Sequence, residues 1–386
     1  MTQIPSDFGF TEEHDLLRKE ARRLLAERCP IAEVRRLAAD PLGHDPELWK
    51  ELGALGWMGL ALPEAFGGAG LGSLPLALLL DEMGRRLLPS PYLASLLAAF
   101  AIEEAAGDSQ KAHWLPDIAS GERIATLALT EPSGGFEPAS VHATAEPCEG
   151  GFVLRGLKSH VLQAQHAHAI VAPFREPSGH LSLFAVELPA RGVLVEPEIG
   201  VDATRRCARV AFESVRVASG AKLERRGEAI LRRAHVRGFA ALAAEMVGAA
   251  DAALEMTRQY AIDRKQFGRQ IGFYQAVKHP LVDVMIGVEL SRNHVLGAAA
   301  ALDHAPPAEA EIAARMAKAF ASDVFATAVR KGVQLHGGYG FTIDCDMHHY
   351  FKRALWSRAT LGDGPHHRRH LAAALIDGNF LNAETL

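Results

Sequence analysis

Cysteine is scarce in this sequence, with four residues among 386, at positions 29, 148, 207 and 345. None belongs to a Cys-x-x-Cys pair, the usual spacing of thiolate metal ligands and redox dithiols. Small secreted domains that depend on disulfides carry a much higher share of cysteine. The scarcity argues against a disulfide scaffold and a cysteine-rich zinc fold, and it favours a reducing compartment.

The sequence also lacks an excess of positive charge and a long apolar run. Its 41 Lys and Arg and 46 Asp and Glu give a formal net charge of −5, whereas nucleic-acid binding needs clustered basic residues. Apolar windows are interrupted by charge well short of the roughly 20 residues that cross a bilayer. The N-terminus has no basic segment followed by an apolar one, so it does not resemble a secretory signal. We therefore expect a cytoplasmic protein with no nucleic-acid partner and no membrane span.

The residues that are present change character twice along the chain. The segment Thr11–Cys29 predicts an amphipathic helix with a buried stripe of Leu16, Leu17, Ala21, Leu24 and Leu25. From about residue 124, short β-branched and aromatic runs alternate with turn residues, and those at Ala169–Ala172 and Leu181–Val186 are apolar enough for interior strands. From about residue 227, three long alanine-rich segments carry apolar residues at helical spacing, which is typical of an antiparallel bundle.

This order predicts an α+β fold in which helices and strands are segregated along the chain. We expect three domains: a helical N-terminal domain (1–123), a middle antiparallel β-barrel or sandwich (124–226) and a C-terminal four-helix bundle (227–386). Strands and helices do not alternate, so a βαβ dinucleotide-binding fold is not expected despite 35 glycines.

Two carboxylates are candidates for acid–base chemistry. Asp363 lies in TLGDGPHH, where it is either the N-cap of a helix that starts near Pro365 or a base at the edge of a cavity. Glu245 lies within the apolar run AALAAEMVGAA, where it either forms a salt bridge at the helix edge or is a buried carboxylate with a raised pKa. His366 and His370 have the spacing of two metal ligands on one helix, but without an HExxH motif we expect no metal.

Two segments have the residues that bind phosphate groups. DRKQFGRQIGFYQAVKH (263–279) places basic residues beside aromatic ones between two long helices, and Arg suits bidentate phosphate binding. QLHGGYGF (334–341) has adjacent glycines, whose bare backbone a ligand can approach closely. Taken singly, each glycine segment is also explained by helix C-capping.

These segments together, in this order, resemble the acyl-CoA dehydrogenase family along essentially the whole chain. The resemblance depends on FTEEHDLLRKEARRLLAE, ELGALGWMGLALPEAFGGAGLG, LALTEPSGG, YAIDRKQFGRQIGFYQAVKH and QLHGGYGF. The ending GFTIDCDMHHYFKRA…LGDGPHHRR looks most like bacterial members that degrade steroid side chains or other bulky acyl-CoAs.

The resemblance implies FAD as cofactor, an acyl-CoA substrate and an electron-transfer flavoprotein or similar acceptor. It also implies a homotetramer, or a heterotetramer with a related subunit. Leu129, Thr130, His160 and Val161 would lie at the flavin ring, with His367 near the cofactor. Arg264, Gln266 and Phe267 would hold the pyrophosphate and adenosine part, and Gln275, Gln334, Gly337 and Gly338 would lie near the adenosine end across the subunit interface.

The implied reaction is α,β-dehydrogenation, in which a carboxylate removes the α proton and the β hydride passes to the flavin. This sequence departs from the family where that carboxylate is expected, because LGDGP replaces the usual YEGT loop. Asp363 is the matching carboxylate, whereas a strict residue count places Leu361 at the base position. Some relatives carry the base at another position, which aligns with Gly238 here. In the flavin-facing segments, Phe136, Glu137 and His160 replace the usual Ser, Asp and Trp.

Several functions therefore remain open. The first is an active acyl-CoA dehydrogenase with Asp363 as base. The second is a subunit that completes the FAD site of a heterotetramer while another chain supplies the base. A flavin oxidase or monooxygenase on the same fold is the third, and a helical structural protein without flavin is the fourth.

Overall fold

The computed structural model describes residues 8–377 of the chain, and these form two compact units. Among the described residues, one unit combines 8–36 with Ser73–Leu88 and 239–377, and the other combines Leu37–Gly72 with Pro89–Gly238. Within residues 8–377, no helix is long and apolar enough to cross a membrane.

The elements follow the expected order of helices, strands and helices. The N-terminal helices are α1 (Glu12–Arg28), α2 (Ile31–Ala39), α3 (Pro46–Ala54), α4 (Ser73–Arg85), α5 (Tyr92–Ala105) and α6 (Asp108–Ala119). The strands are β1 (Ala125–Leu127), β2 (Thr144–Cys148), β3 (Gly151–Leu162), β4 (Ala169–Arg175), β5 (Leu181–Glu187), β6 (Val193–Glu198) and β7 (Cys207–Ala218). The remaining elements are α7 (Glu228–Asp263), β8 (Lys265–Gln266), β9 (Arg269–Gln270), α8 (Gln275–His304), α9 (Pro307–Leu335), α10 (Met347–Ala359) and α11 (Gly364–Leu375).

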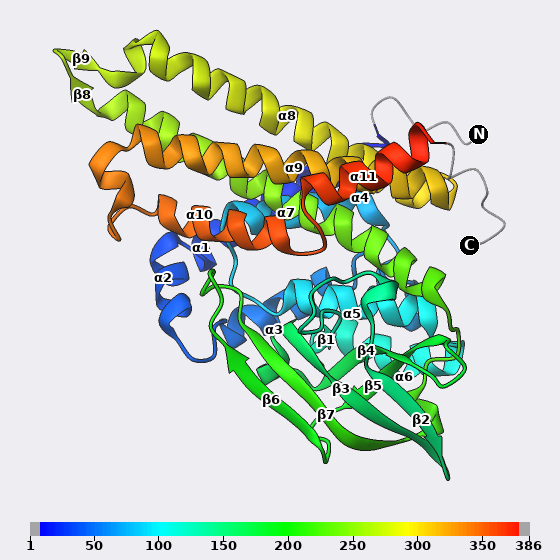
Figure 1. Ribbon diagram of the computed structural model, residues 1–386. Coiled ribbons are helices and arrows are strands. Elements are labelled where there is room, and N and C mark those ends of the chain that lie inside the picture. The colour runs from blue at the N-terminus through cyan, green and yellow to red at the C-terminus, as the bar shows by residue number, and fades with distance from the viewer. Residues whose placement is uncertain (1–7, 378–386) are drawn as a thin grey trace. The chain divides into compact units, whose positions relative to one another are not determined.

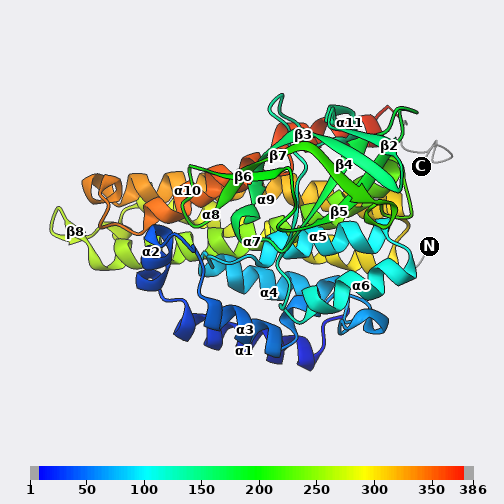
Figure 2. The same ribbon diagram turned by 90° about the horizontal axis from the view of Figure 1, so that it is seen from below.

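The unit that contains β1 to β7 is built on one sheet with the order β1-β4-β2-β3-β7-β6, and β5 pairs with the other edge of β4. Figure 2 shows β2 to β7 gathered in this unit. Phe174 lies at its core and meets Phe184 and Phe212 edge to face. The runs expected to be interior strands are β4 and β5, each buried except at its last residue. The sheet is mainly antiparallel, as expected, except that β1 and β2 both pair with β4 in parallel. Parallel pairing requires a long crossover, which the intervening chain between these strands supplies.

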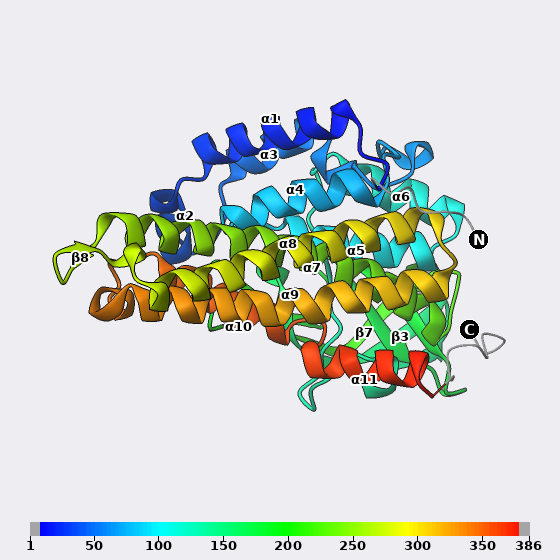
Figure 3. The same ribbon diagram turned by 90° about the horizontal axis from the view of Figure 1, so that it is seen from above.

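The other unit is a helical bundle in which α7, α8 and α9 run side by side (Figures 1 and 3). Helices α10 and α11 both pack along α9. Helices α4 and α7 touch through glycines: a Cβ at Gly84 would lie 1.9 Å from the carbonyl oxygen of Glu245, and one at Gly248 would lie 1.7 Å from that of Asp81. Only glycine permits such close backbone approach, so these two positions fix how α4 and α7 pack.

The predicted N-terminal helix is present as α1, but its predicted buried stripe was partly wrong. Ala21, Leu24 and Leu25 are buried, whereas Leu16 is 61% exposed. Helical periodicity identifies a face only to within about one residue, and the width of that face depends on the partner helix.

Candidate functional site

The predicted flavin-ring residues lie where two strands end next to each other. Leu129 and Thr130 follow β1, and the Ser159 N–H of β3 donates to the Thr130 carbonyl oxygen at 2.8 Å. This bond brings Leu129 and Thr130 beside His160 and Val161. Leu129 and Val161 are buried, whereas the His160 side chain is 71% exposed. The structure therefore brings all four predicted residues together at one edge of the sheet.

A buried ion pair that the sequence reasoning did not identify supports this edge. Lys158 Nζ donates to Glu131 Oε1 at 2.8 Å and to the Pro173 carbonyl oxygen at 3.0 Å. Glu131 also accepts from the backbone N–H groups of His142 and Ala143. Burial alone would raise the pKa of Glu131, but these hydrogen bonds outweigh it and the pKa is lowered. The carboxylate is therefore ionised and serves to hold the segments on either side of the predicted flavin ring.

His160 replaces the tryptophan expected from the family, and it has a local partner. Its backbone is left-handed, with φ 54°. Its N–H donates to Glu198 Oε2 at 2.7 Å, and the same oxygen lies 3.2 Å from its Nδ1. Phe136, where the family has Ser, packs its ring against that of His235 with the centroids 5.4 Å apart. Both departures are accommodated by specific contacts within the sheet unit.

The predicted pyrophosphate residues lie on a hairpin between α7 and α8. Arg264 precedes β8, Gln266 belongs to it, and Phe267 stands at the turn with φ 52° and 89% exposure. The Tyr274 hydroxyl donates to the Gln266 and Phe267 carbonyl oxygens at 3.3 Å, which stiffens the turn. The hairpin therefore presents an exposed guanidinium and an exposed ring on a supported backbone.

The predicted adenosine residues lie at the same end of the bundle (Figure 1). Gln334 is near the end of α9, and Tyr260 near the end of α7 stacks on His336, with ring centroids 4.3 Å apart. Gly337 has φ 63°, so the helix-capping interpretation also holds for it. A Cβ at Gly337 or Gly338 would meet nothing within 4 Å, so this backbone is open to a ligand. Arg264 and Phe267 are exposed, and their predicted role in binding FAD stays a prediction.

The loop before α11 contains the candidate base. Asp363 is half-buried, and its Oδ1 accepts the His366 N–H at 2.9 Å, so Asp363 is the N-cap of α11. Leu361, the alternative from residue counting, is buried and has no titratable group. Gly362 cannot be replaced by a carboxylate residue, because its φ is 89° and a Cβ would lie 2.6 Å from His366 Cδ2. Asp363 is thus the carboxylate that this loop offers.

His367 lies under the loop, fully buried. Its Nε2 donates to the Leu361 carbonyl oxygen at 2.9 Å, and Arg315 Nη1 lies 3.4 Å from its Nδ1. Burial, together with the charges of Lys318 and Arg315, lowers the pKa of His367 to about 2. The ring is therefore neutral and supports the loop, and its predicted proximity to the cofactor stays a prediction.

Glu245 is buried and bonded to an arginine. Arg353 Nη1 donates to Glu245 Oε1 at 2.6 Å, and Arg353 Nη2 lies 3.3 Å from the Leu87 carbonyl oxygen. Both side chains are almost completely inaccessible to solvent. The carboxylate of Glu245 is thus held by a guanidinium, and the pair joins α7 to α10.

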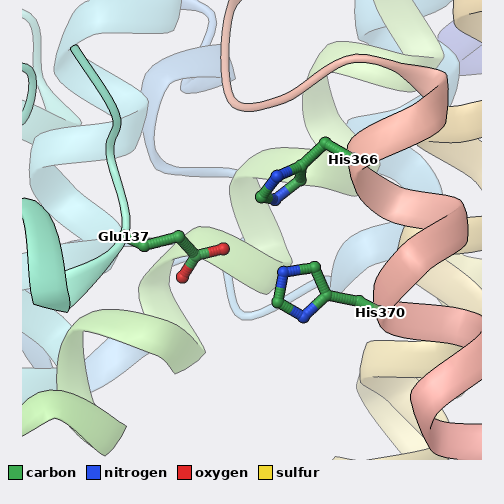
Figure 4. Close-up of side chains that lie close together, drawn as sticks. All are labelled: Glu137, His366 and His370. Atoms are coloured by element: carbon green, nitrogen blue, oxygen red, sulfur yellow. The ribbon is translucent and has the colours of Figure 1, made fainter.

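Two histidine groups have partial metal-site geometry. His366 and His370 project from the same side of α11 with ring centroids 4.7 Å apart (Figure 4), and Glu137, also drawn there, belongs to the other unit. Two histidines supply only half of the ligands of a structural zinc site. Ligand atoms of His160, Glu198 and Cys207 lie within 4.8 Å of one another, but burial raises the pKa of the Cys207 thiol to about 11, which disfavours the thiolate form that binds metal.

Known proteins resemble this chain along most of its length. Profiles of the acyl-CoA dehydrogenase N-terminal, middle and C-terminal domains match residues 11–122, 126–215 and 226–376. Acyl-CoA dehydrogenase IpdE2 of Mycobacterium tuberculosis is 33% identical over 346 residues, which cover 89% of this chain and 91% of that protein.

Two solved structures are similar along nearly their whole length. A variant of the "Tcur3481-Tcur3483 steroid ACAD" is 32% identical, with a TM-score of 0.86, and covers 95% of this chain and 99% of that one. The ChsE4-ChsE5 complex from Mycobacterium tuberculosis is 27% identical, with a TM-score of 0.87, and covers 96% and 98%.

Proposed function

The chain belongs to the acyl-CoA dehydrogenase family, and from this premise we propose that it catalyses α,β-dehydrogenation of an acyl-CoA thioester. FAD supplies the hydride acceptor when it is bound. The single observation that carries the assignment is the loop before α11, where Asp363 is held at a helix N-terminus and its neighbours cannot serve as base.

Asp363 removes the proton from the substrate's α carbon. One of its oxygens accepts the His366 N–H, which fixes the orientation of the carboxylate and leaves the second oxygen to face the substrate. Aspartate is one methylene shorter than the glutamate that the family resemblance leads one to expect, so the α carbon must come closer to the loop. A carboxylate takes so weakly acidic a proton only in a dry site that raises its basicity in the complex.

The binding of FAD would be divided among three groups of this chain's residues. Leu129, Thr130, His160 and Val161 would contact the flavin ring at the edge of the sheet. Arg264, Gln266 and Phe267 would hold the pyrophosphate and adenosine part on their hairpin. Gln275, Gln334, Gly337 and Gly338 would contact the adenosine end bound to a neighbouring subunit. The exposed hairpin and the open glycine backbone support this division.

The protein acts as a tetramer, either of identical chains or with a related subunit. Helix α8 supports association, because Val282, Met285, Ile286 and Leu290 are each about half exposed on it. An apolar cleft of about 280 Å³ adjoins this face, between α8 and α9. Exposed apolar surface of this extent marks a contact with another chain.

The similarity to a steroid acyl-CoA dehydrogenase favours a bulky acyl group as substrate. An electron-transfer flavoprotein would reoxidise the flavin.

A second function is favoured by a specific observation at the same loop. Gly362 leaves no room for a glutamate, and Asp363 already serves as a helix cap, so a related subunit could supply the base while this chain completes the FAD site. The similar ChsE4-ChsE5 structure is a complex of two different chains.

The test is to purify the chain, alone and co-expressed with each related chain of its organism, and to measure FAD per chain. Anaerobic mixing with butyryl-, octanoyl- and palmitoyl-CoA and a steroid-carboxylate CoA thioester should bleach the flavin absorbance. One FAD per chain and bleaching without a partner support the dehydrogenase. Half an FAD per chain, obtained only with a partner, supports the second function. Oxygen consumption that matches turnover would instead indicate an oxidase, and a colourless protein that cannot be reconstituted refutes both.

A further inference from the structure

Lys318 is a buried ammonium group directly beneath the loop that carries Asp363. It lies in the middle of α9 and has no exposed surface. Its Nζ donates to the Gly362 carbonyl oxygen at 2.8 Å, the Ser357 carbonyl oxygen at 3.1 Å and the Ser322 hydroxyl at 3.2 Å. These acceptors use all the N–H groups of an ammonium. All three are neutral, so this contact is not an ordinary ion pair.

Two of the acceptors explain why a lysine is needed here. Ser357 is in the last turn of α10, where helix carbonyls have no partner within the helix and carry partial negative charge. Gly362 is the second of two consecutive left-handed residues, after Leu361. The ammonium group therefore ties the end of α10 to the residue that precedes Asp363. A methionine of similar length would fill the space but would leave both carbonyls unsatisfied.

A second contact fixes the adjacent residue of the same loop. His367 Nε2 donates to the Leu361 carbonyl oxygen, and its other nitrogen lies 3.4 Å from Arg315 Nη1. Arg315 is one turn before Lys318 on α9 and is itself bonded to Glu311 at 2.8 Å. Consecutive carbonyls of the loop are thus connected to α9, one directly and one through a histidine. Left-handed residues other than glycine are strained, and they persist where surrounding contacts determine them.

Lys318 is also electrostatically coupled to the carboxylate. Burial lowers the pKa of Lys318 to about 7, and the negative charges of Asp363 and Asp323 oppose that effect. Arg358 acts with the burial, and the charge of Lys318 in turn lowers the pKa of His367. The negative charge of Asp363 therefore favours the protonated form of Lys318.

We infer that Lys318 is a positioning residue for Asp363: its ammonium group holds the Gly362 carbonyl and thereby sets the direction of the carboxylate. This inference rests on the proposed function of Asp363 as base. It goes beyond packing, because the bonds of Lys318 converge on the loop and the end of the preceding helix.

The test compares Lys318→Met with Ser322→Ala, which removes a partner of the same ammonium group but leaves the loop carbonyl bonded. Both holoproteins should retain FAD. In K318M the amides of residues 362–364 should exchange with deuterium at least tenfold faster than in the wild type. The limiting rate of flavin bleaching should fall by about 10- to 100-fold, with the half-saturating acyl-CoA concentration within about twofold. S322A should stay near the wild type in all three measurements.

The pH dependence of the bleaching rate distinguishes a Lys318 that positions Asp363 from a Lys318 that only stabilises the fold. The wild-type bleaching rate should fall as pH rises above about 7, because a neutral amine has too few N–H groups for its three acceptors. K318M should lack this alkaline decline. If K318M does not fold, Lys318→Gln, which keeps two N–H donors, should give an intermediate exchange rate and bleaching rate.

The outcomes distinguish this inference from the proposed function. If the wild type bleaches with an acyl-CoA and K318M bleaches with the same rate and the same pH profile, the positioning role of Lys318 is overturned. If no acyl-CoA bleaches the wild type, the proposed function fails, and the exchange comparison still tests the contact. Unchanged exchange at residues 362–364 in K318M then refutes it.

Discussion

Glu245→Gln is expected to destabilise the protein while leaving the rate of flavin bleaching nearly unchanged. In the wild type, Arg353 Nη1 lies 2.6 Å from Glu245 Oε1, and both side chains are buried. The amide oxygen of glutamine can still accept that hydrogen bond, but the negative charge that compensates the buried guanidinium is lost.

The magnitude follows from the burial of the pair. Removing one partner of a buried ion pair costs about 3–5 kcal/mol, and we expect about 3 kcal/mol because the variant keeps a hydrogen bond. Replacing both groups by apolar ones of similar size costs much less. The double variant Glu245→Leu with Arg353→Met should therefore unfold closer to the wild type than Glu245→Leu does.

The assay is urea unfolding with excess FAD at one protein concentration, followed by both flavin fluorescence and circular dichroism. The four proteins wild type, E245L, R353M and the double variant form a cycle that isolates the coupling between the two side chains. Anaerobic bleaching by acyl-CoA is measured on E245Q in parallel. If E245Q loses bleaching but keeps the wild-type unfolding midpoint, Glu245 is the base and its structural role is wrong.

Other predictions follow from single contacts. Between pH 7 and 10.5 the unfolded chain binds the proton of Lys318 more tightly than the folded chain does. The unfolding free energy of the wild type should therefore rise, relative to that of K318M, by about 1.4 kcal/mol per pH unit. A difference between the two proteins that does not change with pH would contradict the pKa of about 7. His367 is neutral when folded, so the wild type should lose stability relative to His367→Gln as pH falls below about 6.5; equal acid sensitivity in urea unfolding would count against this. Gly338→Val should weaken FAD binding, measured by titration of the apoprotein, and change stability by less than about 0.5 kcal/mol, since its Cβ meets nothing within 4 Å. Gly337→Val should in addition cost at least about 1 kcal/mol in urea unfolding because of its positive φ, and equal stability of the two variants would refute the distinction.

The features that could be predicted from the sequence are those encoded locally. Periodicity and turn residues indicated the helical, β and helical segments, since each depends on neighbours within a few positions. The connection between two long helices after Asp263 and the cap formed by Asp363, one of its two expected roles, were likewise readable from short segments, although the β8–β9 hairpin in that connection was not predicted. The capping position of Asp363 did not decide its chemistry, because the same residue type serves both roles.

Features that depend on distant residues could not be predicted. Lys318 in an alanine-rich helix looks like an ordinary polar-face residue, and only the return of the chain at Gly362 buries it. The partner of Glu245 lies more than 100 positions away, so a buried base and a buried ion pair were indistinguishable. The parallel pairing of β1 with β4 depends on the path of the intervening chain. Glu131 lies in a segment that resembles the family, but its contact with Lys158 left no signal in the sequence.

The most direct measurement of the central claim is anaerobic flavin bleaching by Asp363→Asn. Asparagine is as good an N-cap as aspartate, so the variant should keep α11, FAD and stability, and it removes only the group that accepts a proton. Asp323→Asn is the matched control. Asp323 accepts a hydrogen bond from Arg368 at 2.7 Å, and its negative charge raises the pKa of Lys318, as that of Asp363 does. We predict that D363N, with wild-type FAD content, loses bleaching by at least about 1,000-fold while D323N stays within about tenfold of the wild type. Bleaching by D363N at a rate near that of D323N would show that the base is elsewhere, in this chain or in a partner.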